Sequence, residues 1–222
     1  MSNKPVVIVD PNFRRMDEIF SPADQGRLRE SVEVVWGKDD PMPQDALLRA
    51  LPDAEALICS DWRYANVLPQ APKLRAVIDV TGAFPATLDY EYCHAHKIRV
   101  LCAIPSFVRQ VAEFSLGLAI AACREIPLGD RLFREGGEEY LHAGNRTTYM
   151  LYGKRVGMIG FGGIGRALKP LLEPFGVTIT AYDPWLSPGY MRSLGVTPVS
   201  LDALLSESDF IFVTAVPTLG HG

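Results

Sequence analysis

Residues 151–184 contain the pattern that most restricts the possible folds of this chain. The apolar run Val156–Ile159 predicts a short buried strand. The glycine pattern Gly160-x-Gly162-x-x-Gly165 follows it at once and leads into a helical stretch. In a dinucleotide site the first glycine allows a tight turn, the second lets the backbone approach a pyrophosphate, and the third lets the helix pack closely on the strand. The stretch therefore predicts a strand, turn and helix that bind a dinucleotide.

An acidic residue follows where the ribose of such a ligand would lie. A second apolar strand, Val177–Tyr182, ends on Asp183, whose carboxylate can accept hydrogen bonds from a 2′-hydroxyl and repels a 2′-phosphate. We therefore predict NAD rather than NADP as the cofactor, and a tight turn without a ligand is the alternative. The candidate cofactor-binding residues in this stretch are Gly160, Phe161, Gly162, Gly163, Ile164, Gly165, Asp183 and Pro184.

Composition excludes several other classes of protein. With 222 residues, 48% of them hydrophobic, the chain can bury a large core in one large or two modest domains. A net charge of −4 without any lysine or arginine block argues against a nucleic-acid partner. Met1–Pro5 does not resemble a signal peptide, and the most apolar segment, Leu116–Cys123, is shorter than the roughly 20 residues that span a bilayer. We expect a cytoplasmic location and no membrane partner.

The cysteines and histidines predict neither disulfides nor a metal site. No C-x-x-C pair occurs, and most of the cysteines lie in apolar runs, so we expect reduced thiols in the core. The cysteines are Cys59, Cys93, Cys102 and Cys123. The run Cys93–His96 suggests metal ligands, but residues one and two apart on a helix point to different faces. Solvated helix histidines are the preferred interpretation.

The first hundred residues alternate between apolar runs and amphipathic stretches, which predicts a mostly parallel sheet covered by helices on both sides. The expected strands are 6–9, 32–36, 56–59, 74–80 and 98–102. The expected helices are 23–31, 44–51 and 88–96.

Two of these strands are followed by residues that suit a small carboxylate ligand. Ligands of parallel sheets bind beyond the carboxyl ends of the strands. Arg63 follows the third strand, and Gly82 and Ala83 follow the fourth, so a guanidinium and exposed backbone N–H groups could bind a carboxylate there. Surface loops with an arginine for solubility are an equal alternative.

A long apolar helix is expected at 107–126, buried nearly all round between domains or in a subunit interface. Residues 127–150 lose this periodicity and predict an arm or loop. Pro170 lies inside the helix that follows the glycine turn, where we expect a kink. Beyond Asp183 the order continues with a helix at 190–194, a strand at 196–199, a helix at 201–205 and a strand at 210–215.

Several motifs in a fixed order resemble the D-2-hydroxyacid dehydrogenase family, which includes phosphoglycerate and glyoxylate/hydroxypyruvate reductases. The motifs are Ala71-Pro72-Lys73-Leu74-Arg75 leading to Gly82 and Leu88-Asp89, then Val111-Ala112-Glu113, Leu151-x-Gly153-Lys154-x-Val156-Gly157, Pro174-Phe175-Gly176 and Tyr182-Asp183-Pro184-Trp185.

The resemblance implies an α/β fold with two Rossmann-like or flavodoxin-like domains, each built on a parallel sheet. These are a substrate-binding domain at 1–104 and, at 105–222, a hinge helix with an incomplete NAD-binding domain, with the active site in the cleft between them. It also implies hydride transfer between NAD and C2 of a small D-2-hydroxy or 2-oxo acid, and a homodimer. By family position, backbone near Gly82 and Ala83 binds the substrate carboxylate, and the adenosine side is lined by Ala215, Val216 and Pro217.

One departure from the family concerns catalysis. The family's arginine, acid and histidine, which polarise the carbonyl and supply the proton, lie after the strand that here ends near Ala215. His221 comes too early to match, and the remaining histidines, which lie elsewhere, are His94, His96 and His142. We therefore assign no catalytic residue and expect a C-terminally incomplete family member with little turnover. An NAD-binding sensor or corepressor-like module and a truncated product without function are the alternatives.

Overall fold

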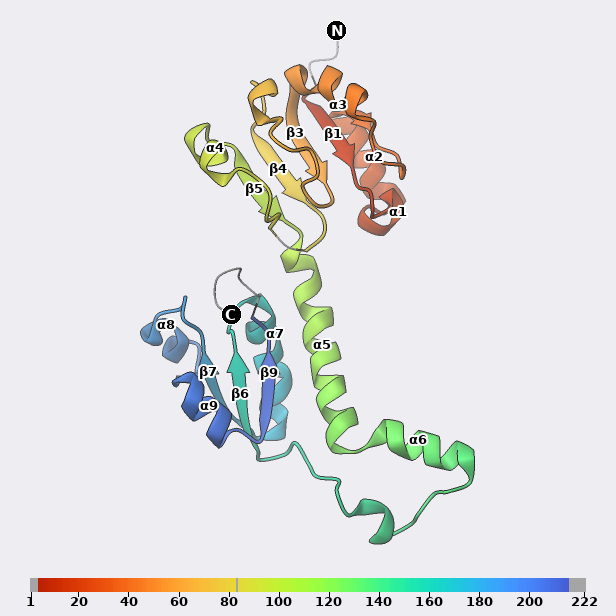
Figure 1. Ribbon diagram of the computed structural model, residues 1–222, viewed down its shortest axis with the longest axis vertical. Helices are drawn as coiled ribbons and strands as arrows, with labels where there is room; N and C mark the ends of the chain where they lie inside the picture. The colour runs from red at the N-terminus through yellow and green to blue at the C-terminus, as the bar shows by residue number, and fades with distance from the viewer. Residues whose placement is uncertain (1–3, 83, 216–222) are drawn as a thin grey trace. The chain divides into compact units, whose positions relative to one another are not determined.

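The computed structural model describes residues 4–82 and 84–215 and divides into two compact units, Met1–Ser106 and Phe107–Gly222 (Figure 1). Each unit is built on its own parallel sheet, which confirms the predicted α/β fold class. The sequence predicts the boundary between the two functional domains after residue 104, close to this division.

The sheet of the first unit has five strands, all paired in parallel in the order β2-β1-β3-β4-β5. The strands are β1 (Val6–Asp10), β2 (Glu33–Trp36), β3 (Ala54–Cys59), β4 (Ala76–Asp79) and β5 (Arg99–Cys102). Because all strands point the same way, the loops that follow β1, β3 and β4 lie at one edge of the sheet, as Figure 1 shows.

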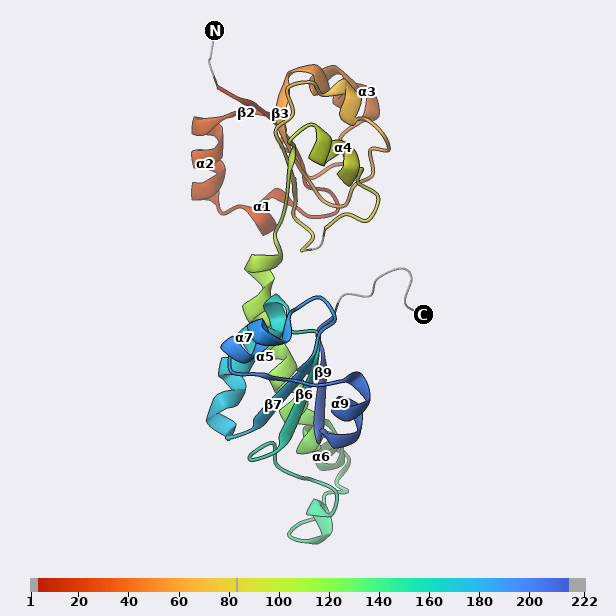
Figure 2. The same cartoon turned by 90° about the vertical axis from the view of Figure 1, so that its left-hand side faces the viewer.

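Helices cover both faces of this sheet (Figure 2). The helices are α1 (Met16–Ile19), α2 (Pro22–Ser31), α3 (Gln44–Ala50) and α4 (Tyr90–Ala95), with 3-10 turns η1 (Leu51–Asp53) and η2 (Leu68–Gln70). Successive strand residues point to opposite faces, so Val7 and Val9 pack with α1 and α2, whereas Ile8 packs with α3 and α4. The short helix α1 was not predicted.

The sheet of the second unit has the order β8-β7-β6-β9, again with parallel pairs. The strands are β6 (Arg155–Ile159), β7 (Thr178–Tyr182), β8 (Thr197–Pro198) and β9 (Phe210–Val213). The helices and turns are α5 (Ile104–Cys123), α6 (Ile126–Glu135), η3 (Ala143–Asn145), α7 (Gly163–Leu172), η4 (Glu173–Phe175), α8 (Pro188–Ser193) and α9 (Leu201–Glu207). The strand β6 and the turn after it therefore lie between β7 and β9.

Within this chain α5 is buried on one face, and its burial nearly all round, between domains or in a subunit interface, stays a prediction. One face, with Ala112, Leu116 and Ala119, packs on the core of the second unit. The opposite face carries Phe114, which is 67% exposed, and Leu118, which is 54% exposed. The apolar composition predicted a helix that is buried on most of its surface, but only one face is buried against other residues of this chain.

Among the described residues, α5 is the one helix long and apolar enough to cross a membrane, judged by length and composition only. The expectation that the most apolar segment is too short for this does not hold for the whole 20-residue helix. The match is weak evidence of a membrane span, because core helices of soluble proteins meet the same criterion.

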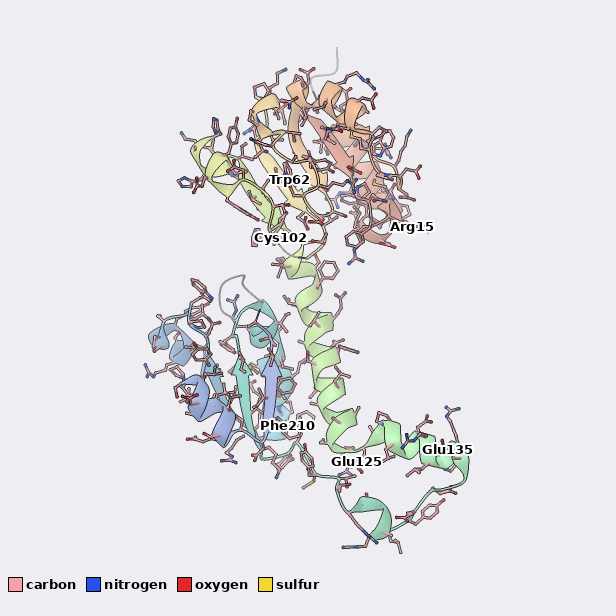
Figure 3. All side chains as sticks on the ribbon, viewed as in Figure 1. Arg15, Trp62, Cys102, Glu125, Glu135 and Phe210 are labelled. Atoms are coloured by element: carbon pink, nitrogen blue, oxygen red, sulfur yellow. The ribbon has the colours of Figure 1, made fainter. Side chains whose placement is uncertain are left out.

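All of the helix α6 except Ile126 lies inside the stretch predicted as an arm or loop, so the prediction of irregular structure is wrong for residues 127–135. Figure 3 labels Glu125 and Glu135, which mark its two ends. Pro127 made the helical pattern hard to recognise in the sequence. It lies in the first turn of α6, where a proline is tolerated because its missing N–H would have no partner.

Further along the chain, α7 continues through Pro170 to its end at Leu172.

Candidate dinucleotide and substrate sites

The turn between β6 and α7 needs glycine at two of its positions. Gly160 has φ +85°, and a Cβ there would lie 2.8 Å from the backbone nitrogen of Ala215. A Cβ on Gly165 would lie 3.1 Å from the carbonyl oxygen of Gly160 and 3.2 Å from the Phe161 ring. The first glycine thus permits the sharp turn, and the third brings the helix against it.

The second glycine borders open space. A Cβ on Gly162 would meet no heavy atom of the described residues within 4 Å, and the residue is exposed as the N-cap of the ten-residue helix α7. The first N–H groups of a helix have no acceptor within it and carry partial positive charge. Room for an anion therefore coincides with donors that point into it, which is the arrangement that a pyrophosphate requires.

Asp183 connects the end of β7 to this turn. Its Oδ2 accepts the Phe161 N–H at 2.8 Å, and its Oδ1 accepts the Trp185 N–H at 2.9 Å. Each carboxylate oxygen has a further lone pair for a hydroxyl donor. A hollow of about 290 Å³ opens beside the carboxylate, lined among others by Met191 and Arg192. The predicted ribose-binding residue thus lies next to both the glycine turn and an open hollow.

The other predicted cofactor residues differ in what they can offer. The Phe161 side chain is fully buried in the core, so the prediction can hold only for its backbone. Ile164 is half-buried, Pro184 is exposed, and Ala215 is exposed beside Gly160. Val216 and Pro217 lie outside the described residues.

In the first unit, Arg63 is bound within the chain. Its Nη2 lies 2.6 Å from Oδ2 of the fully buried Asp10, and its Nη1 donates to the carbonyl oxygen of Asn12 at 2.7 Å. The Tyr64 hydroxyl donates to the same Asp10 oxygen at 2.6 Å. The sequence suggested a guanidinium available to a substrate, whereas the structure shows one engaged by a buried carboxylate.

Burial keeps the Tyr64 hydroxyl and the Cys59 thiol in their neutral forms. It raises the pKa of the Tyr64 hydroxyl, and the hydrogen bond to Asp10 raises it further. Burial and the charge of Asp79 also raise the pKa of the Cys59 thiol. Tyr64 therefore stays a hydrogen-bond donor, and Cys59 stays a protonated core thiol, at any ordinary pH.

A second buried carboxylate, Asp79 at the end of β4, joins two loops. It accepts the backbone N–H of Asp61 at 2.9 Å and that of Thr81 at 2.7 Å, and it also accepts the Thr81 hydroxyl. Gly82 follows with φ +90°, a conformation that favours glycine. Asp79 therefore fixes the turn that carries Gly82, whereas Ala83 lies outside the described residues.

Comparison with known proteins places these features in a family. Residues 116–219 match the model described as "D-isomer specific 2-hydroxyacid dehydrogenase, NAD binding domain". The D-3-phosphoglycerate dehydrogenase of Mycobacterium tuberculosis H37Rv is 35% identical over 199 residues, which are 87% of this chain and 36% of that protein. The crystal structure of a phosphoglycerate oxidoreductase from Rhizobium etli superposes with a TM-score of 0.81 at 32% identity, over 97% of this chain and 66% of that one.

The chain belongs to the D-isomer specific 2-hydroxyacid dehydrogenase family. The glyoxylate reductase of Thermococcus kodakarensis is also 32% identical, over 86% of this chain and 59% of that protein. The chain thus spans about a third to three fifths of the length of these curated relatives. Its glycine turn and Asp183 lie within the matched NAD-binding domain, which confirms NAD as the cofactor.

Several residues that shape these candidate sites were not predicted from the sequence. Asp10 and Asp79 each end an apolar strand, and an acid at that position is the signal that was available. Arg166 donates from Nε to the Gly162 carbonyl oxygen at 3.1 Å, and the Thr214 hydroxyl donates to the Gly160 carbonyl oxygen at 2.6 Å. The Thr214 contact joins residues far apart in the sequence, so no local pattern marks it, whereas the Arg166 contact lies within α7 and its N-cap.

Within residues 4–82 and 84–215, no group of three or more His, Cys, Asp or Glu side chains is placed to hold a metal ion. All the cysteines are free thiols; Cys102 is half-buried and the others are buried. The run Cys93–His96 lies on α4 and its C-cap, where the His96 ring stacks on Tyr92 at 3.8 Å between centroids.

Proposed function

We propose that this chain supplies the substrate-binding and NAD-binding parts of an oxidoreductase that transfers a hydride between NAD and C2 of a small D-2-hydroxy or 2-oxo acid. The observation that carries the proposal is the open space over Gly162 at the start of α7, with Asp183 beside the same turn. We further propose a cytoplasmic location, in keeping with metabolic enzymes such as the phosphoglycerate dehydrogenases and glyoxylate reductases.

Each unit has its own part in this proposal. In the second unit, the backbone N–H groups of Gly162–Gly165 bind the pyrophosphate, and Asp183 accepts the ribose hydroxyls. NAD, when bound, supplies the hydride acceptor. In the first unit, backbone N–H groups in the turn after β4, at Gly82 and Ala83, bind the acid's carboxylate. Asp79 stabilises that turn by accepting the backbone N–H groups of Asp61 and Thr81.

Proton transfer needs a further group beside the substrate, and the described histidines do not supply it. His94 and His96 lie at the end of α4, and His142 precedes η3. We therefore propose that the 222 residues bind NAD without turning over glyoxylate or hydroxypyruvate. An NAD-responsive sensor would share this behaviour, and turnover by these residues alone would contradict the proposal.

The cofactor proposal is tested with Asp183→Asn, which removes the negative charge but keeps the size of the side chain. We expect the wild-type chain to bind NAD and to bind NADP at least about tenfold more weakly, because a carboxylate beside a 2′-phosphate costs about 1 to 4 kcal/mol. The substitution should remove most of this preference. Titration calorimetry with both dinucleotides measures the ratio of dissociation constants.

Arg192 provides the matched control, because it lines the same hollow as Asp183. Once the carboxylate is gone, its guanidinium can pair with the 2′-phosphate. Adding Arg192→Ala to Asp183→Asn should therefore lower NADP affinity and leave NAD affinity nearly unchanged. A wild-type chain that binds NADP as tightly as NAD would contradict the proposed role of Asp183.

We also propose that the chain forms a homodimer through the exposed face of α5, composed of Val111, Phe114 and Leu118. These residues recur at helical spacing, and exposed apolar patches of this kind mark interfaces. We favour a second copy of the chain over lipid as the partner of this face. The other face of α5 packs on the core of the second unit, so the helix cannot be surrounded by lipid. Two further apolar side chains in the segment that follows α5, Phe133 of α6 and Leu141, are also exposed.

The dimer is tested with the double variant Phe114→Glu, Leu118→Glu. Two buried charges without partners should weaken association at least about tenfold, since each anchor is worth at least about 1 kcal/mol. Light scattering after size-exclusion chromatography should show a dimer for the wild type and a monomer for the variant. Leu205→Glu, on the exposed side of α9, is the control and should stay dimeric. A monomeric wild type would contradict the proposal.

A further inference from the structure

The arginine that follows β3, Arg63, is already neutralised. Arg63 follows β3, between the loops that follow β1 and β4. Its guanidinium forms an ion pair with Asp10 at 2.6 Å and donates a further bond to the Asn12 carbonyl. Since Asp10 is fully buried, releasing Arg63 would leave a buried carboxylate without its cation, which is costly. Arg63 is therefore not available to pair with a second anion.

The arginines that follow β1 are also paired with acids. Arg15 lies 2.7 Å from Asp17, and Arg14 Nη1 lies 3.9 Å from Glu18. The exposed Asp61, directly after β3, adds a negative charge to the same edge. A phosphate group carries about two negative charges and needs arginine or lysine partners that are not already satisfied. The loops after β1 and β3 therefore disfavour a phosphorylated acid.

Aromatic side chains occupy the same edge. Phe13, in the loop after β1, is 66% exposed, and Phe84, in the loop after β4, is 54% exposed. The buried Trp62, in the loop after β3 and labelled in Figure 3, packs edge-to-face on Tyr64 with centroids 5.2 Å apart. The strand β3 separates β1 from β4, so both exposed rings border one stretch of the sheet edge.

The polar contacts hold these rings in place. The bond from Arg63 to the Asn12 carbonyl fixes the peptide next to Phe13. The Thr87 hydroxyl donates to the Trp62 carbonyl oxygen at 2.7 Å and so ties the loop that carries Phe84 to the loop after β3. The buried polar network thus supports two exposed phenyl rings rather than presenting a cation.

We propose that this site selects 2-hydroxy or 2-oxo acids whose group beyond C2 is uncharged and apolar, with Phe13 and Phe84 contacting that group. This inference rests on the proposed substrate site near Gly82. It separates the chain from relatives named D-3-phosphoglycerate dehydrogenase, despite the 35% identity. Arg63 is a positioning residue for the loop of Phe13, not a ligand of the substrate.

The test uses the complete 222-residue chain and two matched pairs of acids, with binding followed by the backbone amide NMR signals of Thr81 and Gly82. Pyruvate and phenylpyruvate differ by a phenyl group, and glycerate and 3-phosphoglycerate differ by a phosphate. We expect phenylpyruvate to bind at least about tenfold more tightly than pyruvate, because burying its phenyl ring against aromatic side chains contributes this much binding free energy. We expect 3-phosphoglycerate to bind no more tightly than glycerate.

Variants assign the selectivity to residues. Phe13→Ala and Phe84→Ala should each reduce the advantage of phenylpyruvate over pyruvate severalfold without changing the affinity for pyruvate. Tyr152→Ala removes an equally exposed aromatic ring that precedes β6 in the other unit, and should change neither affinity.

Each contrary result has its own meaning. Tighter binding of 3-phosphoglycerate than of glycerate, or equal binding of pyruvate and phenylpyruvate, would overturn the proposed selectivity and leave the substrate site in place. If none of the four acids shifts Thr81 or Gly82, the substrate site itself is refuted, and the selectivity with it. NAD binding to the second unit is measured separately and stays unaffected by that outcome.

Discussion

Gly162→Ala is expected to weaken NAD binding about tenfold to a hundredfold while leaving the thermal stability of the chain unchanged. Within residues 4–82 and 84–215, no atom lies within 4 Å of a Cβ at this position, so we expect the folded chain to accept it. The methyl group would instead occupy the space through which a pyrophosphate approaches the first N–H groups of α7. Losing one charge-assisted hydrogen bond costs about 1.5 to 3 kcal/mol, which corresponds to this range of affinity.

Gly160→Ala is the matched control, with the opposite expectation for stability. Its φ of +85° strains any other residue, and the added Cβ would lie 2.8 Å from the backbone nitrogen of Ala215. We expect the free energy of unfolding to fall by at least about 2 kcal/mol. Calorimetric melts and NAD titrations of both variants measure the two effects. A similar loss of thermal stability in Gly162→Ala would show that the space over Gly162 is not free.

Asp10→Ala should be among the most destabilising single substitutions in the first unit. It leaves the Arg63 guanidinium and the Tyr64 hydroxyl without their shared acceptor. Breaking a buried ion pair in this way costs about 3 to 5 kcal/mol, and because Arg63 is one-third exposed we expect the lower end. Urea unfolding followed by tryptophan fluorescence gives the free energy of unfolding.

A surface ion pair provides the comparison for that measurement. Asp45 lies 2.8 Å from Arg49 on the exposed side of α3, with both side chains about 70% exposed. Asp45→Ala should cost no more than about 0.5 kcal/mol, because exposed pairs one helical turn apart contribute little. If Asp10→Ala were as mild, Asp10 would not be the anchor of Arg63 and Tyr64.

The sequence predicted the glycine turn well because its function depends on local spacing. Gly160, Gly162 and Gly165 lie within one strand, turn and helix, so a pattern of six residues determines the geometry. The pairing of Asp10 with Arg63 depends instead on β1 and β3 lying side by side. No local sequence pattern shows that these two strands are neighbours. The sequence was therefore equally consistent with an Arg63 side chain that is free to bind a ligand.

Apolar composition was the least reliable guide. The helix α5 is apolar on two faces, and the sequence does not distinguish a face covered within the chain, as at Ala112, from one left open, as at Phe114. The helix α6 was missed for a different reason. Pro127 and Gly129 usually interrupt helices, but Pro127 falls in the first turn, where its backbone geometry suits a helix.

The two hydrogen bonds of Asp183 have an evolutionary consequence. The carboxylate that we propose distinguishes the two dinucleotides also accepts the N–H of Phe161, inside the glycine turn. A lineage that exchanged this residue in order to use a 2′-phosphate would lose an acceptor from the turn at the same time. We therefore expect homologues that lack an acid at position 183 to carry a compensating acceptor for that N–H. In such homologues, a change of residue 183 would then occur together with a second substitution that supplies the new acceptor.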